Sequence, residues 1–118
     1  MTRVLVVEPH PATAAALIAL LDRHGVPFCV WCQSLDEAEP IVAAGDADVV
    51  LVSWLWARWK EPLKRLRLGM PIRTRLVGLL ADDSPDYFAT ALGGRCDVAV
   101  TYDGLDAALD RILQPNHH

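Results

Sequence analysis

Polar side chains that could carry chemistry follow two valine-rich runs of the chain. Glu8 and His10 come directly after the first run, and Ser53 comes directly after the other. A serine acts as a nucleophile only beside a general base and a group that orients that base. His10 could serve as the base, but no acidic residue is placed to orient it. We therefore interpret Ser53 as a small polar residue, and we predict no catalytic residues and no enzyme activity.

The three cysteines raise a second candidate chemistry. Cys29 and Cys32 have the C-x-x-C spacing of redox pairs and metal sites, and Cys96 stands apart from them. A redox pair normally lies at a helix N-terminus, where the thiolate is favoured, and a zinc site would need two further ligands. These two cysteines instead lie along or just past an expected strand, where residues three apart point to opposite faces. An odd count also argues against a disulfide framework, so we predict no metal and no cofactor.

Five short apolar runs alternate with helix-like segments, and together these elements must position the polar side chains. The runs are rich in valine and leucine, as is typical of strands buried on both faces. They are Arg3–Val7, Phe28–Trp31, Asp48–Val52, Leu76–Leu80 and Asp97–Val100. The alternation predicts right-handed crossovers and one doubly wound α/β domain over residues 1–115, with a five-stranded parallel sheet and helices on both faces. We interpret residues 116–118 as a tail left by a purification tag.

The expected helices carry their own start and stop signals. Ser34 and Glu37 have the spacing of a capping box, and Pro40 should kink or shorten the helix that they open. The remaining starts are Pro11, Pro62, Pro85 and the N-cap candidate Asp103, and the stops are Gly25, Gly45 and the Gly93–Gly94 pair. In this fold class ligands bind beyond the carboxyl ends of the strands, which places a site among residues 8–11, 53–59, 81–84 and 101–103.

Length and composition exclude several classes of protein. A chain of 118 residues suffices for one domain with a sizeable core, and a hydrophobic content of 53% excludes a disordered chain. No apolar run reaches the roughly 18 to 20 residues that span a membrane, and the start lacks a cleavable signal pattern. We therefore expect a cytoplasmic protein with no membrane association.

Four segments resemble the receiver domains of response regulators. Residues 4–11 (VLVVEPHP) are similar to the VLVVDDHP opening of receivers, especially those that precede a helix-turn-helix output domain. Residues 47–53 (ADVVLVS) resemble the third receiver strand, which ends in the phospho-accepting aspartate. Residues 76–83 resemble the fourth strand and its loop, and residues 94–102 resemble the Gly-Ala-Asp-x-Tyr-x-x-Lys segment. The resemblance covers nearly the whole chain in order, and it implies the strand order 2-1-3-4-5 and a role in two-component signal transduction or a phosphorelay.

The positions that bind magnesium and accept the phosphoryl group differ from those of receivers. Receivers hold the ion with two adjacent acids, which are Glu8 and Pro9 here, and with the acceptor aspartate, which is Ser53 here. Magnesium demands octahedral oxygen ligation and gives up its water reluctantly. One glutamate beside a proline and a serine is therefore a poor magnesium site.

The residues that contact the phosphoryl group in receivers are also different here. The hydroxyl residue after the fourth strand is replaced by Leu80, with Ala81 retained beside it, and the lysine after the fifth strand is replaced by Thr101. The aromatic switch residue is replaced by Val98, so plain packing by Leu80 and Val98 would replace the switch pair. Because phosphoryl transfer relies on positioned charge, we interpret the chain as a pseudo-receiver that works without phosphorylation.

Such a module would act through protein–protein contacts. We expect a kinase, an output domain or another signalling protein as its partner, and the chain is either free-standing or the N-terminal domain of a transcription regulator. Receivers often pair through the fourth helix, fifth strand and fifth helix, which predicts a homodimer within residues 85–113. The tryptophans after Ser53 either pack inside or form an interface, where tryptophan is enriched. The candidate partner surface comprises Trp54, Trp56, Trp59, Tyr102, Asp106 and Arg111.

Basic residues are concentrated in one segment of a chain whose net charge is −4. Seven of the eleven lysines and arginines lie between Arg58 and Arg75, with only Glu61 opposing them. We favour a solvated helix face over a docking patch for an acidic partner or nucleic acid. Because no DNA-reading motif accompanies the segment, we expect no direct nucleic-acid binding.

One alternative function is a cobalamin-binding α/β domain. Residues 8–10, residues 53–55 and the Gly93–Gly94 pair faintly resemble the D-x-H-x-x-G, S-x-L and G-G pattern of such domains. That resemblance implies cobalt ligation by His10. Two departures weaken it, because Thr13 replaces a glycine of the pattern and the glycine pair does not follow the fourth strand.

Overall fold

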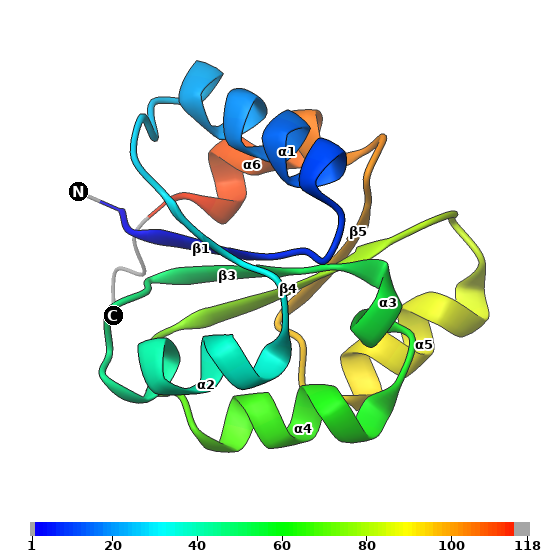
Figure 1. The fold of residues 1–118 in the computed structure, drawn as a ribbon. Helices are drawn as coiled ribbons and strands as arrows, with labels where there is room; N and C mark the ends of the chain where they lie inside the picture. The colour runs from blue at the N-terminus through cyan, green and yellow to red at the C-terminus, as the bar shows by residue number, and fades with distance from the viewer. Residues whose placement is uncertain (1, 115–118) are drawn as a thin grey trace.

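A five-stranded parallel sheet runs through the centre of the molecule, with its strands in the order β2-β1-β3-β4-β5 (Figure 1). The strands are β1 (Val4–Val7), β2 (Val30–Cys32), β3 (Val49–Val52), β4 (Arg75–Leu80) and β5 (Val98–Thr101). The computed structural model describes residues 2–114, and the predicted tail of residues 116–118 lies outside them. The predicted fold class and strand order are confirmed.

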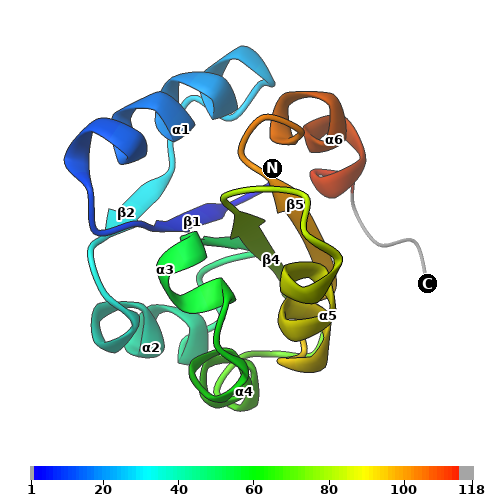
Figure 2. The same ribbon diagram turned by 90° about the vertical axis from the view of Figure 1, so that its right-hand side faces the viewer.

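Helices cover both faces of the sheet (Figure 2). One face carries α1 (Pro11–Arg23) and α6 (Leu105–Ile112), and the other carries α2 (Leu35–Ala43), α3 (Trp54–Ala57), α4 (Lys60–Leu68) and α5 (Pro85–Gly93). Within residues 2–114 no helix is long and apolar enough to cross a membrane.

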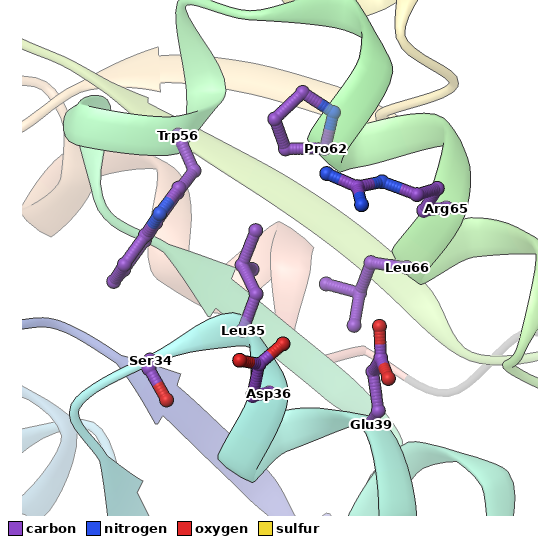
Figure 3. Close-up of a pocket in the computed structure, with 8 residues that line it drawn as sticks. All are labelled: Ser34, Leu35, Asp36, Glu39, Trp56, Pro62, Arg65 and Leu66. Carbon is purple, nitrogen blue, oxygen red and sulfur yellow. The ribbon is translucent and has the colours of Figure 1, made fainter.

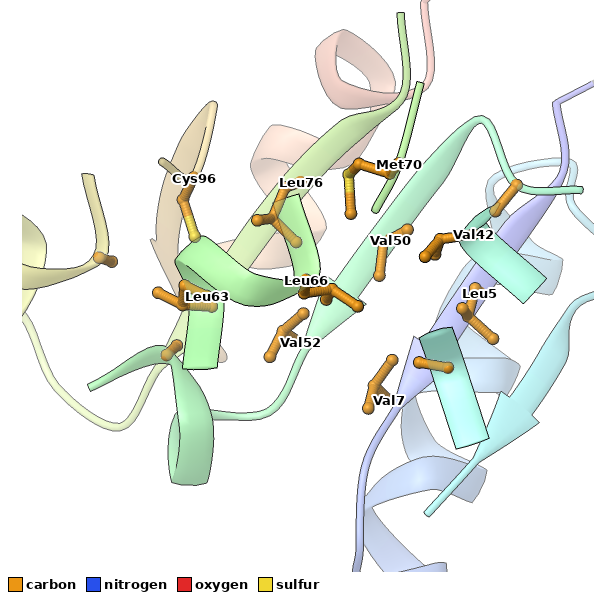
Figure 4. Packing of buried hydrophobic residues seen from close by; sticks show 14 of the residues in the cluster. Leu5, Val7, Val42, Val50, Val52, Leu63, Leu66, Met70, Leu76 and Cys96 are labelled. Atoms are coloured by element: carbon orange, nitrogen blue, oxygen red, sulfur yellow. The ribbon is translucent and has the colours of Figure 1, made fainter. Parts of the chain in front are cut away.

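Both faces of the inner strands are buried, which explains their unbroken valine and leucine runs. Alternate residues of β1 belong to different clusters, since Leu5 and Val7 face the side of α2 and α4, whereas Val4 and Val6 face the side of α1. Figure 4 shows the first cluster, where Val50 of β3 and Leu66 of α4 also pack. Burying a leucine side chain contributes roughly 1.5 to 3 kcal/mol, so these clusters hold the layers together.

Several helix signals act as predicted. The N–H of Glu37 donates to the Ser34 hydroxyl oxygen over 3.2 Å, and the Glu37 carboxylate accepts the N–H of Gln33 over 2.9 Å. The predicted shortening at Pro40 is wrong, since helix α2 continues past it to Ala43; the proline removes one N–H without ending the helix.

Other predicted boundaries are wrong. The second strand begins at Val30, and Phe28 is 83% exposed in the preceding loop, because an apolar run alone cannot distinguish a strand from its approach. The short helix α3 was not predicted, and α4 begins at Lys60, which places Pro62 inside its first turn, where an N–H is not needed. The residue before α6 is Gly104 rather than Asp103.

Candidate functional site

Three polar residues from distant parts of the chain meet at the carboxyl edge of the sheet. Glu8 follows β1, Ser53 follows β3 and Tyr102 follows β5. Their backbone N–H groups extend the strand ladders by one residue, donating to Cys32 O over 3.0 Å, to Val7 O over 2.9 Å and to Leu80 O over 3.1 Å respectively. The sheet therefore fixes the starting points of all three side chains.

The hydroxyl of Tyr102 lies at the centre of this site. It donates to Glu8 Oε1 over 3.0 Å and accepts the backbone N–H of Trp54 over 3.2 Å. It also lies 3.4 Å from the hydroxyl oxygen of Ser53. We call Glu8, Ser53 and Tyr102 the tyrosine network. The bond to Glu8 is the shortest of the three, so it is the main link of the network.

The Glu8 carboxylate is buried and already occupied. Glu8 is 1% exposed, and its Oε2 atom accepts the backbone N–H of His10 over 3.1 Å. The indole N–H of Trp31 donates to the Glu8 carbonyl over 2.8 Å. Within residues 2–114, every buried side-chain nitrogen and oxygen has a hydrogen-bond partner. The network is therefore internally satisfied.

The environment keeps Tyr102 in its protonated form. Burial, and next the charge of Glu8, raise the pKa of Tyr102 to about 12, although hydrogen bonds from Ser53 and the Trp54 N–H act in the opposite direction. The phenol is thus a donor at neutral pH, as its bond to Glu8 requires.

The residues at this edge do not fit a magnesium ion. Pro9 has no carboxylate, both oxygens of Glu8 accept hydrogen bonds, and Ser53 offers only a neutral hydroxyl. Magnesium requires several oxygen ligands in octahedral geometry. A shallow cavity of about 400 Å³ does open above the network, lined by Glu8, His10, Thr13, Trp54, Ala81 and Tyr102.

The other predicted phosphorylation positions have separate structural roles. Leu80 is buried in the cluster beneath α2 and α4, and Val98 packs against the cluster on the opposite face. Both side chains thus pack, on different sides of the sheet, and the replacement of a receiver's switch pair by plain packing stays a prediction. Thr101 Oγ1 accepts the N–H of Gly104 over 3.0 Å and stabilises the turn into α6.

The cysteines are dispersed. Cys29 packs on the side of α1, and Cys32 is buried on the side of α2. Burial raises the pKa of Cys29, raises that of Cys32 to about 11, and raises that of Cys96 to about 12. Protonated thiols are poor nucleophiles and metal ligands. The part of the chain that the structure describes contains no group of three or more His, Cys, Asp or Glu residues able to hold a metal.

The cobalamin alternative is not supported. His10 and Ser53 lie at the carboxyl edge of the sheet, whereas Gly93 and Gly94 lie where α5 leads into β5, at the amino edge. A side chain on Gly94 would come within 2.9 Å of the Leu63 Cβ, so this glycine serves helix packing. The three parts of the pattern therefore do not form one site.

The tryptophans divide between packing and exposure. Trp56 packs against the core and lines a second cavity of about 360 Å³ between α2 and α4 (Figure 3). The guanidinium of Arg58 lies 4.5 Å from the Trp54 ring centre and 5.4 Å from that of Trp59. Trp59 is 57% exposed, so it is the tryptophan most available to a partner.

Two basic side chains of the 58–75 segment are structural rather than solvated. Arg67 donates to Ile72 O over 2.9 Å and to Asp97 Oδ2 over 3.2 Å, which ties the end of α4 to the start of β5. Arg75 donates to Ile112 O over 2.7 Å. Their partners are backbone carbonyls and a carboxylate from other parts of the chain, which sequence patterns do not reveal.

Asp106, a residue of the predicted partner surface, also contacts another side chain of the chain. Its carboxylate lies 2.6 Å from Nε2 of His24, and that of Asp110 lies 2.8 Å from Nδ1. The hydrogen bond to Asp106, and then that to Asp110, raise the pKa of His24. Asp106 thus joins α6 to the end of α1, so it is not a free surface charge. Arg111 remains exposed.

Comparison with known proteins identifies the fold. No family model and no curated protein matches the chain. Among solved structures it is similar to a response regulator from Thermotoga maritima, with 20% identity, 96% of this chain and 98% of that chain covered, and a TM-score of 0.78. It is also similar to an orphan response regulator of H. pylori, with 17% identity, 96% and 97% covered, and a TM-score of 0.77.

A third similar structure comes from a signalling complex. It is the receiver domain of a Saccharomyces cerevisiae response regulator crystallised with a histidine phosphotransfer protein, with 21% identity, 94% of this chain and 86% of that chain covered, and a TM-score of 0.77. The chain therefore has the fold of response-regulator receiver domains, as the sequence resemblance implied.

Proposed function

We propose that this receiver-fold chain is a signalling module that works without phosphorylation, through protein–protein contacts, and that it is not an enzyme. The observation that carries the proposal is the tyrosine network. At the edge where receivers hold the metal and the phosphoryl group, the Tyr102 hydroxyl bonds to Glu8 and to the N–H of Trp54. The positions of the receiver chemistry are thus occupied by the chain's own side chains.

The geometry around Ser53 supports this proposal. Ser53 is 1% exposed, and its hydroxyl oxygen accepts the N–H of Leu55 over 3.3 Å at the start of α3. A phosphoryl donor would have to displace Tyr102 to reach it. Thr101 carries no charge to stabilise a transferring group, and its hydroxyl oxygen already accepts the N–H of Gly104.

Similar structures support a wider signalling role. Receiver domains are known in contact with histidine phosphotransfer proteins, as in the similar yeast structure, and in DNA-binding response regulators, as in a similar protein of Staphylococcus aureus. We assign this chain a kinase, an output domain or another signalling protein as partner, in the cytoplasm. It acts alone or as the N-terminal domain of a transcription regulator, and pairs with a second copy through α5, β5 and α6.

Treatment with acetyl phosphate and magnesium tests the proposal. We expect the intact mass to remain unchanged, and amide NMR signals near Ser53 to stay in place when beryllofluoride and magnesium are added. Tyr102→Phe is the matched variant, because it removes the hydroxyl while keeping the ring. An acyl-phosphate adduct on the unmodified chain would overturn the proposal.

A further inference from the structure

Three large aliphatic side chains are exposed together where α4 and α5 end. Leu68 is 86% exposed, Ile72 is 93% exposed and Leu92 is 50% exposed. They line a hollow of about 690 Å³ whose floor includes Cys96. Isolated exposed aliphatic residues are ordinary, but a contiguous group beside a hollow marks an interaction site. This hollow lies at the amino edge of the sheet, away from the tyrosine network.

Basic side chains surround these aliphatic residues. We call the whole surface the α4–α5 patch, and it comprises Lys64, Arg67, Leu68, Ile72, Leu92 and Arg95. The one carboxylate in its lining, Asp97, is paired with Arg67 at 3.2 Å. Lys64 lies 3.8 Å from the exposed Glu61, and an exposed pair of this kind binds weakly. Within residues 2–114, Arg95 forms no salt bridge. The patch is thus cationic on a chain whose net charge is −4.

The backbone of Arg95 supplies an independent observation. Its φ is +78°, in the left-handed region that side chains other than glycine rarely adopt. The helices α1 and α2 end in the same way, but they place Gly25 at φ +88° and Gly45 at φ +75° in that position. At all three ends the next N–H bonds back to a carbonyl five residues earlier, as from Cys96 to Ala91 O over 3.2 Å.

An arginine therefore stands at α5 where this chain otherwise uses glycine. Backbone strain of this kind persists mainly at functional positions. The Arg95 side chain takes part in the lining of the patch. The strained backbone and the exposed aliphatic group thus point to the same surface.

We propose that the α4–α5 patch binds an acidic amphipathic helix of a partner protein. The leucine and isoleucine side chains contact the apolar face of that helix, and Lys64 and Arg95 face its aspartates and glutamates. Binding of an amphipathic helix in an apolar groove is a common recognition mode, and complementary charge selects the partner. This inference names a docking surface for the proposed protein–protein function, and it rests on that part of the function alone.

Selection from a displayed library of random 16-residue peptides (about four helical turns) against the full chain tests the inference. We expect the selected peptides to be rich in aspartate and glutamate, with leucine, isoleucine or phenylalanine at helical spacing. The affinity of a selected peptide, measured by fluorescence anisotropy, should fall about tenfold in Leu68→Ser/Ile72→Ser, as for interface anchors. It should fall severalfold in Arg95→Gly, and it should weaken as salt is added.

The matched control is Phe28→Ser/Val30→Ser, which removes exposed apolar side chains at the β2 edge and should leave the affinity unchanged. Circular dichroism verifies that each variant is folded. The inference is overturned if the selection yields no acidic peptides, or if binding survives the Leu68→Ser/Ile72→Ser change. It is also overturned if sedimentation shows that this change dissociates a homodimer, because the occupant would then be a second copy. Phosphorylation by acetyl phosphate would refute the proposed function but leave these results intact.

Discussion

The hydroxyl of Tyr102 donates to Glu8 Oε1 over 3.0 Å, although 94 positions separate the two residues in sequence. The bond joins the ends of β1 and β5, which are not neighbours in the sheet. It therefore crosses the edge at which a receiver would assemble its phosphorylation site.

Removing this hydroxyl should destabilise the fold. In Tyr102→Phe the buried Glu8 carboxylate loses a donor, and an unsatisfied buried acceptor costs about 1 to 3 kcal/mol. Urea unfolding measures this loss. The control is Tyr87→Phe, since Tyr87 is 38% exposed and should change the free energy of unfolding little. Equal effects of the two changes would contradict a structural role for the network.

Replacing Ser53 by aspartate should not restore receiver chemistry. The new carboxylate would face Glu8 without a lysine beside it, and two carboxylates at short range repel each other. The Tyr102 hydroxyl would still lie beside the new side chain. We expect Ser53→Asp to take up no beryllofluoride with magnesium, as followed by tryptophan fluorescence, because Trp54 adjoins the site.

The matched variant for that experiment combines Pro9→Asp, Ser53→Asp, Leu80→Thr and Thr101→Lys with Tyr102→Ala. The first four changes supply acids, hydroxyl and lysine, and the last removes the phenol from the edge. We expect beryllofluoride binding only in this combined variant. Binding by Ser53→Asp alone would show that the network does not block the site.

The contacts of His24 should make stability depend on pH. Hydrogen bonds to Asp106 and Asp110 raise the pKa of His24 above its usual value of 6.5. These pairs therefore stabilise the fold fully below about pH 6.5, and the contribution is lost as pH rises through the raised pKa. Urea unfolding across this range should show the loss in the native chain but not in Asp106→Asn/Asp110→Asn. The same pH dependence in that variant would show that the contacts of His24 are not its cause.

A homodimer through α5, β5 and α6 should respond to Arg111. We expect Arg111→Glu to shift sedimentation towards the monomer, because it reverses an exposed charge on α6. Asp106 is unsuitable for this test, since its substitution also breaks the contact with His24. Arg23→Glu on α1 is the control and should leave the dimer intact. An unchanged dimer in Arg111→Glu would place the interface elsewhere.

Arg95→Gly should raise stability while it weakens peptide binding. Glycine adopts φ +78° without the strain that a side chain brings, and we expect a gain of about 0.5 to 1 kcal/mol in the free energy of unfolding. Urea unfolding and anisotropy on the same preparation measure both effects. A loss of stability in Arg95→Gly would show that the side chain contributes structural contacts that outweigh the strain.

The sequence by itself determined the framework of this protein. The valine-rich runs form strands that are buried on both faces, as Val6 and Val50 show. Such strands have a continuous run of apolar residues, which is visible in the local sequence. The alternation of strands and helices then predicted a parallel sheet and placed Glu8 and Ser53 at its carboxyl edge, and the resemblance to receivers implied the strand order. The start of the edge strand β2 was misplaced, since an apolar run alone does not separate a strand from the loop before it.

The tertiary structure alone decided which side chains meet. Tyr102 was predicted to face a partner, but its hydroxyl points to Glu8, because that direction depends on how β5 lies relative to β1. The contact between His24 and Asp106 spans 82 positions in sequence, and the φ of Arg95 depends on how α5 joins β5. Such contacts arise from the packing of distant elements, and no local spacing in the chain encodes them.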